Sequence, residues 1–311
     1  MEYIGEIAAL AAASCWVITA LVLASAGRHV GATIVNAIRI WIAIAILLLL
    51  VKLNSDTFWP EVSSSSLYAL ALSGLVGLAI GDQFLYRALI DAGPRLSTLT
   101  ISITPALTAI LAMLVLGEML DATDVLGMIL TIIGIGIAVA PTQDNNIQKK
   151  YPHLARGIFF AFLGAMGQAL GLVLAKIGMQ GTDPITNTIH FTEVSPLAAT
   201  YIRMCFGGIG ATLMLVIYLV FRTKNEKKIK MQLNKTLILI FIGAIFGPVL
   251  GVWLGLISVK NINAGVAATL MGISPILIIP FAKIFEKEAI TKNGIIGALL
   301  STIGVAILFL S

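Results

Sequence analysis

Charged residues are scarce in this chain of 311 residues. Only 11% are Asp, Glu, Lys or Arg, against about 25% in a typical soluble domain. Hydrophobic residues make up 59% of the chain, and its mean hydropathy is +1.01. Because so few charges cannot cover so much apolar surface, the composition excludes a soluble globular protein and predicts an integral membrane protein.

Metal-binding and reactive side chains are few as well. The chain has two cysteines and three histidines, at Cys15, Cys205, His29, His153 and His190. The cysteines fall in separate apolar stretches without a Cys-x-x-Cys pair, and the histidines are far apart in loops, so we expect no disulfide framework and no metal site. No GxxxxGK[ST], HExxH or paired-aspartate motif is present. The sequence therefore predicts no cofactor, no catalytic residue and no use of ATP.

The chain contains ten apolar stretches, each matching the length of about 20 residues that a membrane-spanning helix needs. We predict an all-α integral membrane protein with ten transmembrane helices, over residues 5–26, 33–52, 67–90, 95–117, 123–141, 157–179, 197–221, 236–259, 264–285 and 293–310. The N-terminus lacks a basic region and a small-residue cleavage site, so the first span is expected to remain in the mature protein.

The second five stretches repeat the first five. A shift of 170 residues superimposes the third to fifth stretches on the eighth to tenth without a gap. The matched residues include Gly77 and Gly247, Gly81 and Gly251, Pro105 and Pro275, Glu118 and Glu288, Gly127 and Gly297, and Gly134 and Gly304. A unit that crosses the membrane five times must have its copy inserted upside down, an arrangement common in secondary transporters. We predict two inverted five-helix repeats, 1–141 and 156–311, joined by a linker at 142–155.

Family-like motifs accompany this repeat. Arg39 and Arg203 lie early in the second helix of each half, at a shift of 164 residues. TPALTAILAMLVLGEML and SPILIIPFAKIFEKEAI end the fourth helices, and GMILTIIGIGIAV and GALLSTIGVAILF form the fifth. In these features the chain resembles the ten-helix members of the drug/metabolite transporter superfamily, built from two EamA-type domains. The resemblance covers nearly the whole chain. It implies a secondary carrier or exporter of small polar or amphipathic metabolites, often amino acids, without naming the substrate.

Ionisable residues inside the predicted spans are an informative signal, because a charge at the bilayer centre costs at least about 2.5 to 3.5 kcal/mol. Five lie there, Arg39, Asp82, Arg87, Lys176 and Arg203, and of these Arg39, Asp82 and Arg203 are candidate pathway residues. Asp82 is the deepest and the only acid among them. We interpret it either as a substrate-pairing or proton-coupling residue or as one half of a permanent ion pair with Arg39 or Arg87. Lys176 lies near a helix end, where it could extend to the interface. Arg39 and Arg203 could hold a substrate carboxylate or pair with backbone carbonyls.

Polar and aromatic side chains complete the candidate substrate pathway. They are Trp16, Asn36, Gln83, Tyr86, Thr104, Gln168 and Trp253. An apolar pathway with few polar groups suits an amphipathic organic solute, although Trp and Tyr also fit an interfacial belt. Pro105 and Pro275 are hinge candidates, because proline frees backbone carbonyls within a helix; static packing kinks are the alternative.

Small residues recur at helical spacing in both fifth helices: Gly127, Thr131 and Gly134, then Gly297, Ser301 and Gly304. They predict close helix packing, within the chain or in a homodimer. Glu118 and Glu288 lie at helix ends, where we expect solvated caps or loop contacts.

Loop charges bear on orientation in the cell membrane. One face carries thirteen loop Lys and Arg residues, and the other has only Lys52, Lys176 and Lys260. The positive-inside rule places the basic face in the cytoplasm and both termini outside, whereas the family resemblance implies cytoplasmic termini. Contact with anionic lipid accounts for the net charge of +5 without a nucleic-acid partner.

The sequence as a whole favours a secondary transporter and no enzymatic activity. We predict export of amino acids or similar small metabolites by alternating access, with proton coupling through Asp82 as one version. The alternative is a lipid-handling protein, or another membrane-embedded enzyme or flippase that does not use ATP.

Overall fold

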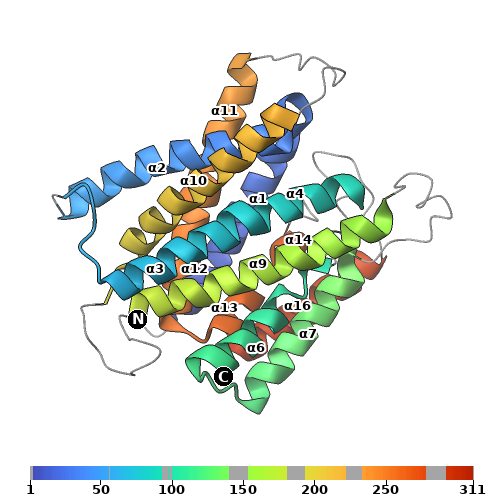
Figure 1. The fold of residues 1–311 in the computed structure, drawn as a ribbon. Helices are drawn as coiled ribbons and strands as arrows, with labels where there is room; N and C mark the ends of the chain where they lie inside the picture. Colours follow the sequence, from blue (N-terminus) through green and yellow to red (C-terminus); the bar gives the residue numbers. More distant parts are fainter. Residues whose placement is uncertain are drawn as a thin grey trace.

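Helices form almost all of the part of the chain that the computed structural model describes, which comprises residues 3–55, 57–92, 97, 100–139, 153–180, 193–221, 233–277 and 292–310. In chain order they are α1 (Ile4–Val30), α2 (Ala32–Ser55), α3 (Ser64–Ser73), η1 (Gly74–Gly81), α4 (Asp82–Asp91), α6 (Thr104–Leu116), α7 (Ala122–Val139), α9 (Leu154–Gln180), α10 (Pro196–Phe221), α11 (Leu233–Ala244), η2 (Ile245–Gly251), α12 (Val252–Asn261), α13 (Ala264–Met271), α14 (Ser274–Leu277) and α16 (Lys292–Leu310). Figure 1 shows α2, α10, α3 with α4, and α9 lying side by side.

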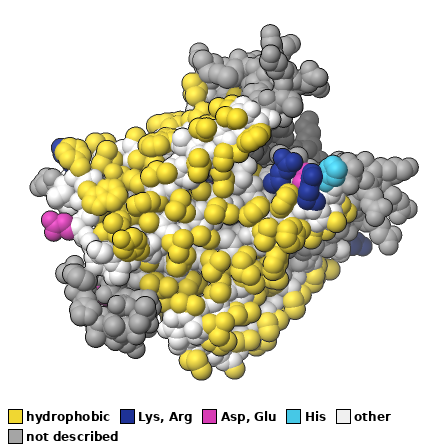
Figure 2. All heavy atoms as spheres, in the orientation of Figure 1, with side chains coloured by type: hydrophobic (Ala, Val, Ile, Leu, Met, Phe, Trp, Pro, Cys, Tyr) yellow, Lys and Arg dark blue, Asp and Glu magenta, His cyan; other side chains and the backbone are white. Residues whose placement is uncertain are grey.

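Within the described residues, six helical segments are long and apolar enough to cross a membrane: Thr33–Ser55, Ser64–Ala88, Leu154–Gln180, Pro196–Phe221, Lys235–Asn261 and Lys292–Phe309. Shorter apolar helices cover Ile4–Thr19, Thr104–Leu116 and Ala122–Ile137. Large apolar side chains are exposed on the helix surfaces, and the face in Figure 2 is mostly hydrophobic. The chain is therefore an integral membrane protein. The predicted span 264–285 extends beyond the described residues, so the count of ten helices stays a prediction.

The predicted third and eighth spans are continuous rods that each contain a π-helical segment in the middle. The first rod is α3, η1 and α4, and the second is α11, η2 and α12. The π-helical segments end at Gly81 and Gly251, which the shift of 170 residues places in register. π-helical turns inside α-helices are uncommon and frequently accompany functional sites. Asp82 follows the first π-helical segment and Val252 follows the second, so these two equivalent positions carry an acid in one half and an apolar residue in the other.

The predicted fourth span is broken where we expected a continuous helix over 95–117. Residues 102–103 form a turn, and α6 begins at Thr104. Pro105 occupies the first turn of α6, where a missing backbone N–H leaves no hydrogen bond unmade. The Thr104 hydroxyl donates to the Ile101 carbonyl oxygen at 2.7 Å, which satisfies an acceptor beside the break.

The predicted ninth span has the same kind of break, so a continuous helix over 264–285 is also wrong. Residues 272–273 form a turn between α13 and α14, and Pro275 is the second residue of α14. The Ser274 hydroxyl donates to the Met271 carbonyl oxygen at 3.0 Å. Both prolines therefore lie in the first turn of a new helix instead of bending a continuous one.

The two glycine-containing helices α7 and α16 pack against each other along their length. A Cβ atom added to Gly134 would overlap Ser301, and one added to Gly304 would overlap Thr131. The Ser301 hydroxyl donates to the Thr131 carbonyl oxygen at 3.1 Å. The small residues therefore allow close helix packing within one chain, as predicted. Because this interface is already filled, a homodimer would need a different surface.

Helices from the two predicted repeats interlock. The first helix, α1, packs along α11, η2 and α12, and α9 packs along α3, η1 and α4. The pairs α2 with α10 and α6 with α13 likewise join residues before 141 to residues after 156. Each of these contacts therefore joins a helix of one predicted repeat to a helix of the other. The helix that Asp82 begins, α4, packs against α9, η1 and α2.

Candidate functional site

Asp82 forms a buried ion pair with Arg39. Asp82 is the first residue of α4, and the Arg39 Nη2 atom of α2 donates to its Oδ2 atom at 2.5 Å. Arg39 Nε donates to Asn36 Oδ1 at 2.9 Å, and the Arg39 Cζ atom lies 5.5 Å from the centre of the Tyr86 ring. The Arg39 and Asp82 side chains are only 11% and 12% exposed. The structure thus brings four of the predicted pathway residues together.

This geometry decides between the pairings that the sequence left open. Asp82 pairs with Arg39, whereas the Arg87 Nε atom lies 3.6 Å from Asp91 Oδ2, with its side chain 53% exposed. The interpretation that Arg39 pairs with a backbone carbonyl is wrong, because its guanidinium binds a carboxylate and a side-chain amide. Removing one partner of a buried pair leaves an uncompensated charge, at a cost of about 3 to 5 kcal/mol.

Arg203 is buried beside the continuous helix formed by α3, η1 and α4, and no acidic side chain in the described part of the chain forms an ion pair with it. It lies in α10, is 4% exposed, and its Nε atom has no hydrogen-bond partner among the residues described. A Cβ atom added to Gly77 of η1 would lie 3.6 Å from Arg203 Nη2. Asp82 follows Gly77 by five residues, and its charge acts on Arg203 through space. Asp82 thus lies near two guanidinium groups, and of these two it is hydrogen-bonded to Arg39.

Two of the candidate pathway residues, Trp16 and Gln168, lie against the ends of the π-helical segments. A Cβ atom added to Gly81 would lie 3.4 Å from the backbone nitrogen of Gln168, and one added to Gly251 would lie 2.5 Å from Trp16 Nε1. Each π-helical segment therefore ends against a candidate pathway residue, and at Gly251 there is no room for a larger side chain. Trp16 and Gln168 are both half-buried.

The remaining candidate pathway and hinge residues do not gather at one site. Gln83 Nε2 lies 3.4 Å from Thr33 Oγ1 of α2, and Trp253 is half-buried in α12. Thr104 is buried, and its hydroxyl donates a hydrogen bond to the Ile101 carbonyl oxygen. Pro105 lies where the broken spans meet, because a Cβ atom added to Gly272 would lie 3.4 Å from its Cγ atom. The surroundings of the Pro275 side chain lie outside the described part.

A second buried ion pair was missed by sequence reasoning. The Lys176 Nζ atom lies 2.6 Å from Glu118 Oε1 and donates to the Ile262 carbonyl oxygen at 2.6 Å. Glu118 Oε2 accepts from the backbone N–H of Ala264 at 2.7 Å, at the start of α13. The side chains are 7% and 11% exposed, so the interpretations of an interfacial Lys176 and a solvated Glu118 are wrong, whereas the contact of Glu118 with a helix end is confirmed. The sequence did hold a signal for this pair, because Glu118 and Lys176 have opposite charges and the chain has few charged residues.

A third ionic cluster joins α4 to the beginning of α9. Arg156 Nε donates to Asp91 Oδ2 at 2.8 Å, and Arg156 Nη2 donates to Asp91 Oδ1 at 3.1 Å. These hydrogen bonds hold the pKa of the Asp91 carboxyl below its usual value. In Figure 2, basic, acidic and histidine side chains gather at one edge of the apolar face. Arg156 and Lys176 lie towards opposite ends of α9, so this helix is tied at both ends.

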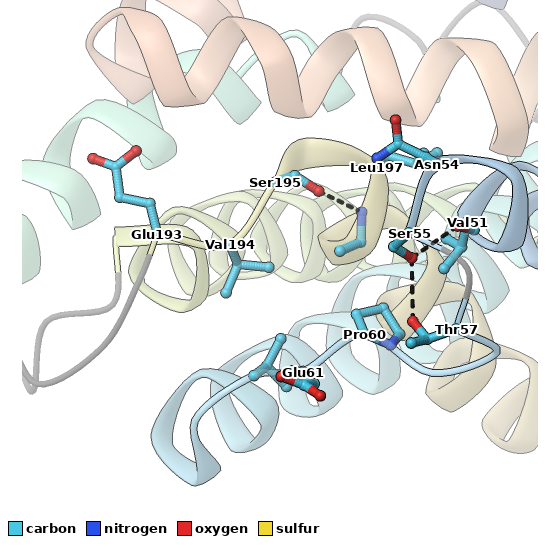
Figure 3. A pocket seen from close by; sticks show the side chains of 12 residues that line it. Val51, Asn54, Ser55, Thr57, Pro60, Glu61, Glu193, Val194, Ser195 and Leu197 are labelled. Carbon is cyan, nitrogen blue, oxygen red and sulfur yellow. Dashed lines mark hydrogen bonds between the residues drawn. The ribbon is translucent and has the colours of Figure 1, made fainter.

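A cavity of about 420 Å³ lies between the end of α2 and the beginning of α10. Its lining residues are Val51, Asn54, Ser55, Thr57, Pro60, Glu61, Val62, Glu193, Val194, Ser195, Leu197 and Ala198 (Figure 3). Glu193 Oε2 lies 2.9 Å from Lys260 Nζ, at the face with few basic residues. None of the predicted pathway residues lines this cavity, so it is separate from the pair of Arg39 and Asp82.

Comparison with known proteins identifies the family. The model of the EamA-like transporter family matches residues 3–140 and 155–310. The chain belongs to the EamA-like transporter family. An uncharacterized transporter from Clostridium kluyveri is 25% identical over 149 residues, which is 48% of each chain. The match thus spans about half the length of that relative. A crystal structure with a TM-score of 0.75 and 17% identity shares the fold over 99% of this chain and 96% of the other.

Proposed function

We propose that this member of the EamA-like family is a secondary transporter that exports amino acids or similar small metabolites. The observation that carries the proposal is the buried pair of Arg39 and Asp82 beside the π-helical segment η1. Ionisable side chains at membrane depth are costly and typically line substrate or ion pathways. The pathway would also include Asn36, Tyr86 and the other polar and aromatic candidates named above.

Alternating access is the mechanism proposed, with 1–141 and 156–311 as inverted repeats. The interlocked packing and the breaks at 102–103 and 272–273 support it. Discontinuous helices near the membrane centre are typical of the sites around which transporter halves rearrange. Pro105 and Pro275, at the starts of the following helices, are the proposed hinge positions.

Proton coupling is proposed to operate through Asp82. The charged and titratable groups facing it are Arg39 from α2, Arg203 from α10 and Tyr86 from α4. A proton on Asp82 would remove its attraction for a cationic group of the solute. Proton and solute ammonium would therefore compete for Asp82, and this competition is the condition for exchange of protons against an exported amino acid.

Transport by purified protein in proteoliposomes tests this proposal. A panel of labelled amino acids and metabolites is assayed for uptake, with and without a pH gradient. We expect wild-type protein to accumulate an amino acid when the gradient is imposed. Asp82→Asn is expected to abolish gradient-driven accumulation but to retain solute exchange, because the carboxylate that accepts the proton is gone.

Arg87→Gln is the matched control, because Arg87 lies on the same helix and its side chain is largely exposed. It is expected to transport like the wild type. Full gradient dependence in Asp82→Asn would remove the coupling proposal. Movement of labelled lipid between leaflets, without uptake of any amino acid or metabolite in the panel, would favour the lipid-handling alternative.

A further inference from the structure

The two equivalent arginines have different surroundings. Arg39 has a carboxylate partner, Asp82, that follows the end of the π-helical segment η1. The residue that follows the other segment, η2, is Val252, so this position supplies no acid for Arg203. The repeat therefore supplies two buried cations but only one matching anion.

Arg203 is held in place by close backbone packing. A Cβ atom added to Gly74 would overlap the Arg203 carbonyl oxygen, and one added to Gly77 would lie 3.3 Å from the Gly171 Cα atom of α9. Glycine is needed at Gly74, where the backbones of η1 and α10 approach closely, and at Gly77 the backbone of α9 leaves little room for a side chain. The guanidinium thus lies beside a rigid three-helix contact. Its Nε atom has no hydrogen-bond partner in the described part of the chain.

A buried cation without a counter-ion is expensive, and the cost falls when an anion binds. We infer that Arg203 is the anion-binding residue of the transport site and that it takes a carboxylate group of the solute. This inference rests on the proposed function and adds the chemical class of the solute. A planar guanidinium matches a carboxylate through two parallel hydrogen bonds.

Charge balance favours a solute with one carboxylate. Asp82 is already paired with Arg39, so one carboxylate group of a solute supplies the partner that Arg203 lacks, whereas a phosphate dianion would bring a second negative charge with no cation to pair with. Asp82 follows Gly77, beside which the Arg203 guanidinium lies, by five residues on the same continuous helix. A small zwitterion can therefore place its carboxylate at Arg203 and its ammonium group at Asp82.

Ligand-dependent thermal unfolding of the purified, full-length protein tests the inference without requiring transport. The probes are 4-methylpentanoate and 4-methylpentanamide, which have the same apolar body and differ in the carboxylate. Because a ligand that binds the folded state raises the Tm, we expect the acid to stabilise wild-type protein and the amide to do so much less. Loss of a charge-assisted hydrogen-bonded pair predicts about tenfold to hundredfold weaker binding of the acid by Arg203→Gln.

Arg203→Lys keeps the charge and provides a second variant if the glutamine variant does not fold. It should bind the acid more weakly than wild type, because an ammonium cannot make the paired hydrogen bonds. Arg87→Gln is the control and should bind as wild type does. Equal stabilisation by acid and amide in wild type overturns the inference, as does undiminished binding of the acid by both Arg203 variants.

The transport assay separates failure of this inference from failure of the proposed function. Selective binding of the acid through Arg203 without accumulation of any solute would retain the anion site and remove the transporter proposal. Accumulation of an amino acid by wild type, with equal uptake and equal binding of the acid by the Arg203 variants, would retain the transporter proposal and remove the anion site.

Discussion

At the scale of single residues, a few ion pairs carry most of the polar chemistry of the described interior. Arg39 and Asp82 form one pair, and Asp91 with Arg156 forms another nearer the helix end. Their environments differ, because both members of the first pair are nearly inaccessible whereas Arg156 is 44% exposed. Exposed pairs contribute little to stability unless their geometry is bidentate. The two hydrogen bonds of Arg156 to Asp91 meet that condition.

Asp91→Asn is expected to lower the Tm of the protein at neutral pH. The hydrogen bonds from Arg156 lower the pKa of Asp91. The pair therefore stabilises the folded state above the unfolded pKa of about 3.9, and this stability is lost as pH falls through the lower folded pKa. Thermal unfolding across a pH series checks this. The difference in Tm between wild type and variant should shrink as pH falls below about 4. A difference that grows with acidification would contradict the assignment.

At the scale of elements, helix ends inside the molecule are stabilised by side chains from elsewhere in the chain. The Glu118 carboxylate accepts a hydrogen bond at the beginning of α13, and a negative charge is favourable at a helix N-terminus. Lys176 donates to the Ile262 carbonyl oxygen, which lies just after α12. The pair therefore joins the ends of two successive helices to α9.

Glu118→Gln is expected to destabilise the protein by about 3 to 5 kcal/mol, because it leaves the Lys176 ammonium buried without its counter-ion. The double variant Glu118→Gln with Lys176→Met should be more stable than Glu118→Gln alone, since the unpaired charge is then absent. Unfolding in detergent, arranged as a double-mutant cycle, measures the coupling. Additive effects of the two substitutions would show that the ion pair contributes no coupling energy.

At the scale of the whole molecule, the face that carries few basic residues also contains the polar cavity beside Glu61 and Glu193. The count of loop charges predicts that this face lies outside the cell. Cysteine substitutions at Thr57 and Lys292, on opposite faces and in a background without Cys15 and Cys205, test the orientation. An impermeant thiol reagent applied to intact cells should label position 57 and leave position 292 unmodified. The reverse pattern would place both termini in the cytoplasm.

Apolar length and repeated glycines were sufficient to predict much of this architecture. They give the positions of the long spans and the close packing of α7 on α16. An ion pair between Asp82 and Arg39 was one of the alternatives that the sequence offered for Asp82, because a buried carboxylate needs a cationic partner. The breaks at 102–103 and 272–273 were missed, since Thr104 and Ser274 satisfy the nearby carbonyls and no apolar pattern shows that.

Contacts between distant segments could not be predicted in the same way. Glu118 and Lys176 are 58 residues apart, and their meeting depends on how α9 crosses the loop after α6. The π-helical segments likewise depend on the neighbouring helices that approach their glycines. Local sequence patterns report which residues are apolar, whereas these features depend on the relative placement of whole helices.

The attachment of α9 at both ends restricts how the molecule can rearrange. Arg156 ties the beginning of this helix to Asp91, and Lys176 ties its far end to Glu118. A rocking motion of α9 against the first half can pivot on one end only if the tie at the other end is released. Under the proposed alternating access, we expect conformers open to opposite sides of the membrane to differ in which of the two ties is intact, and the relative strength of the ties to set their populations.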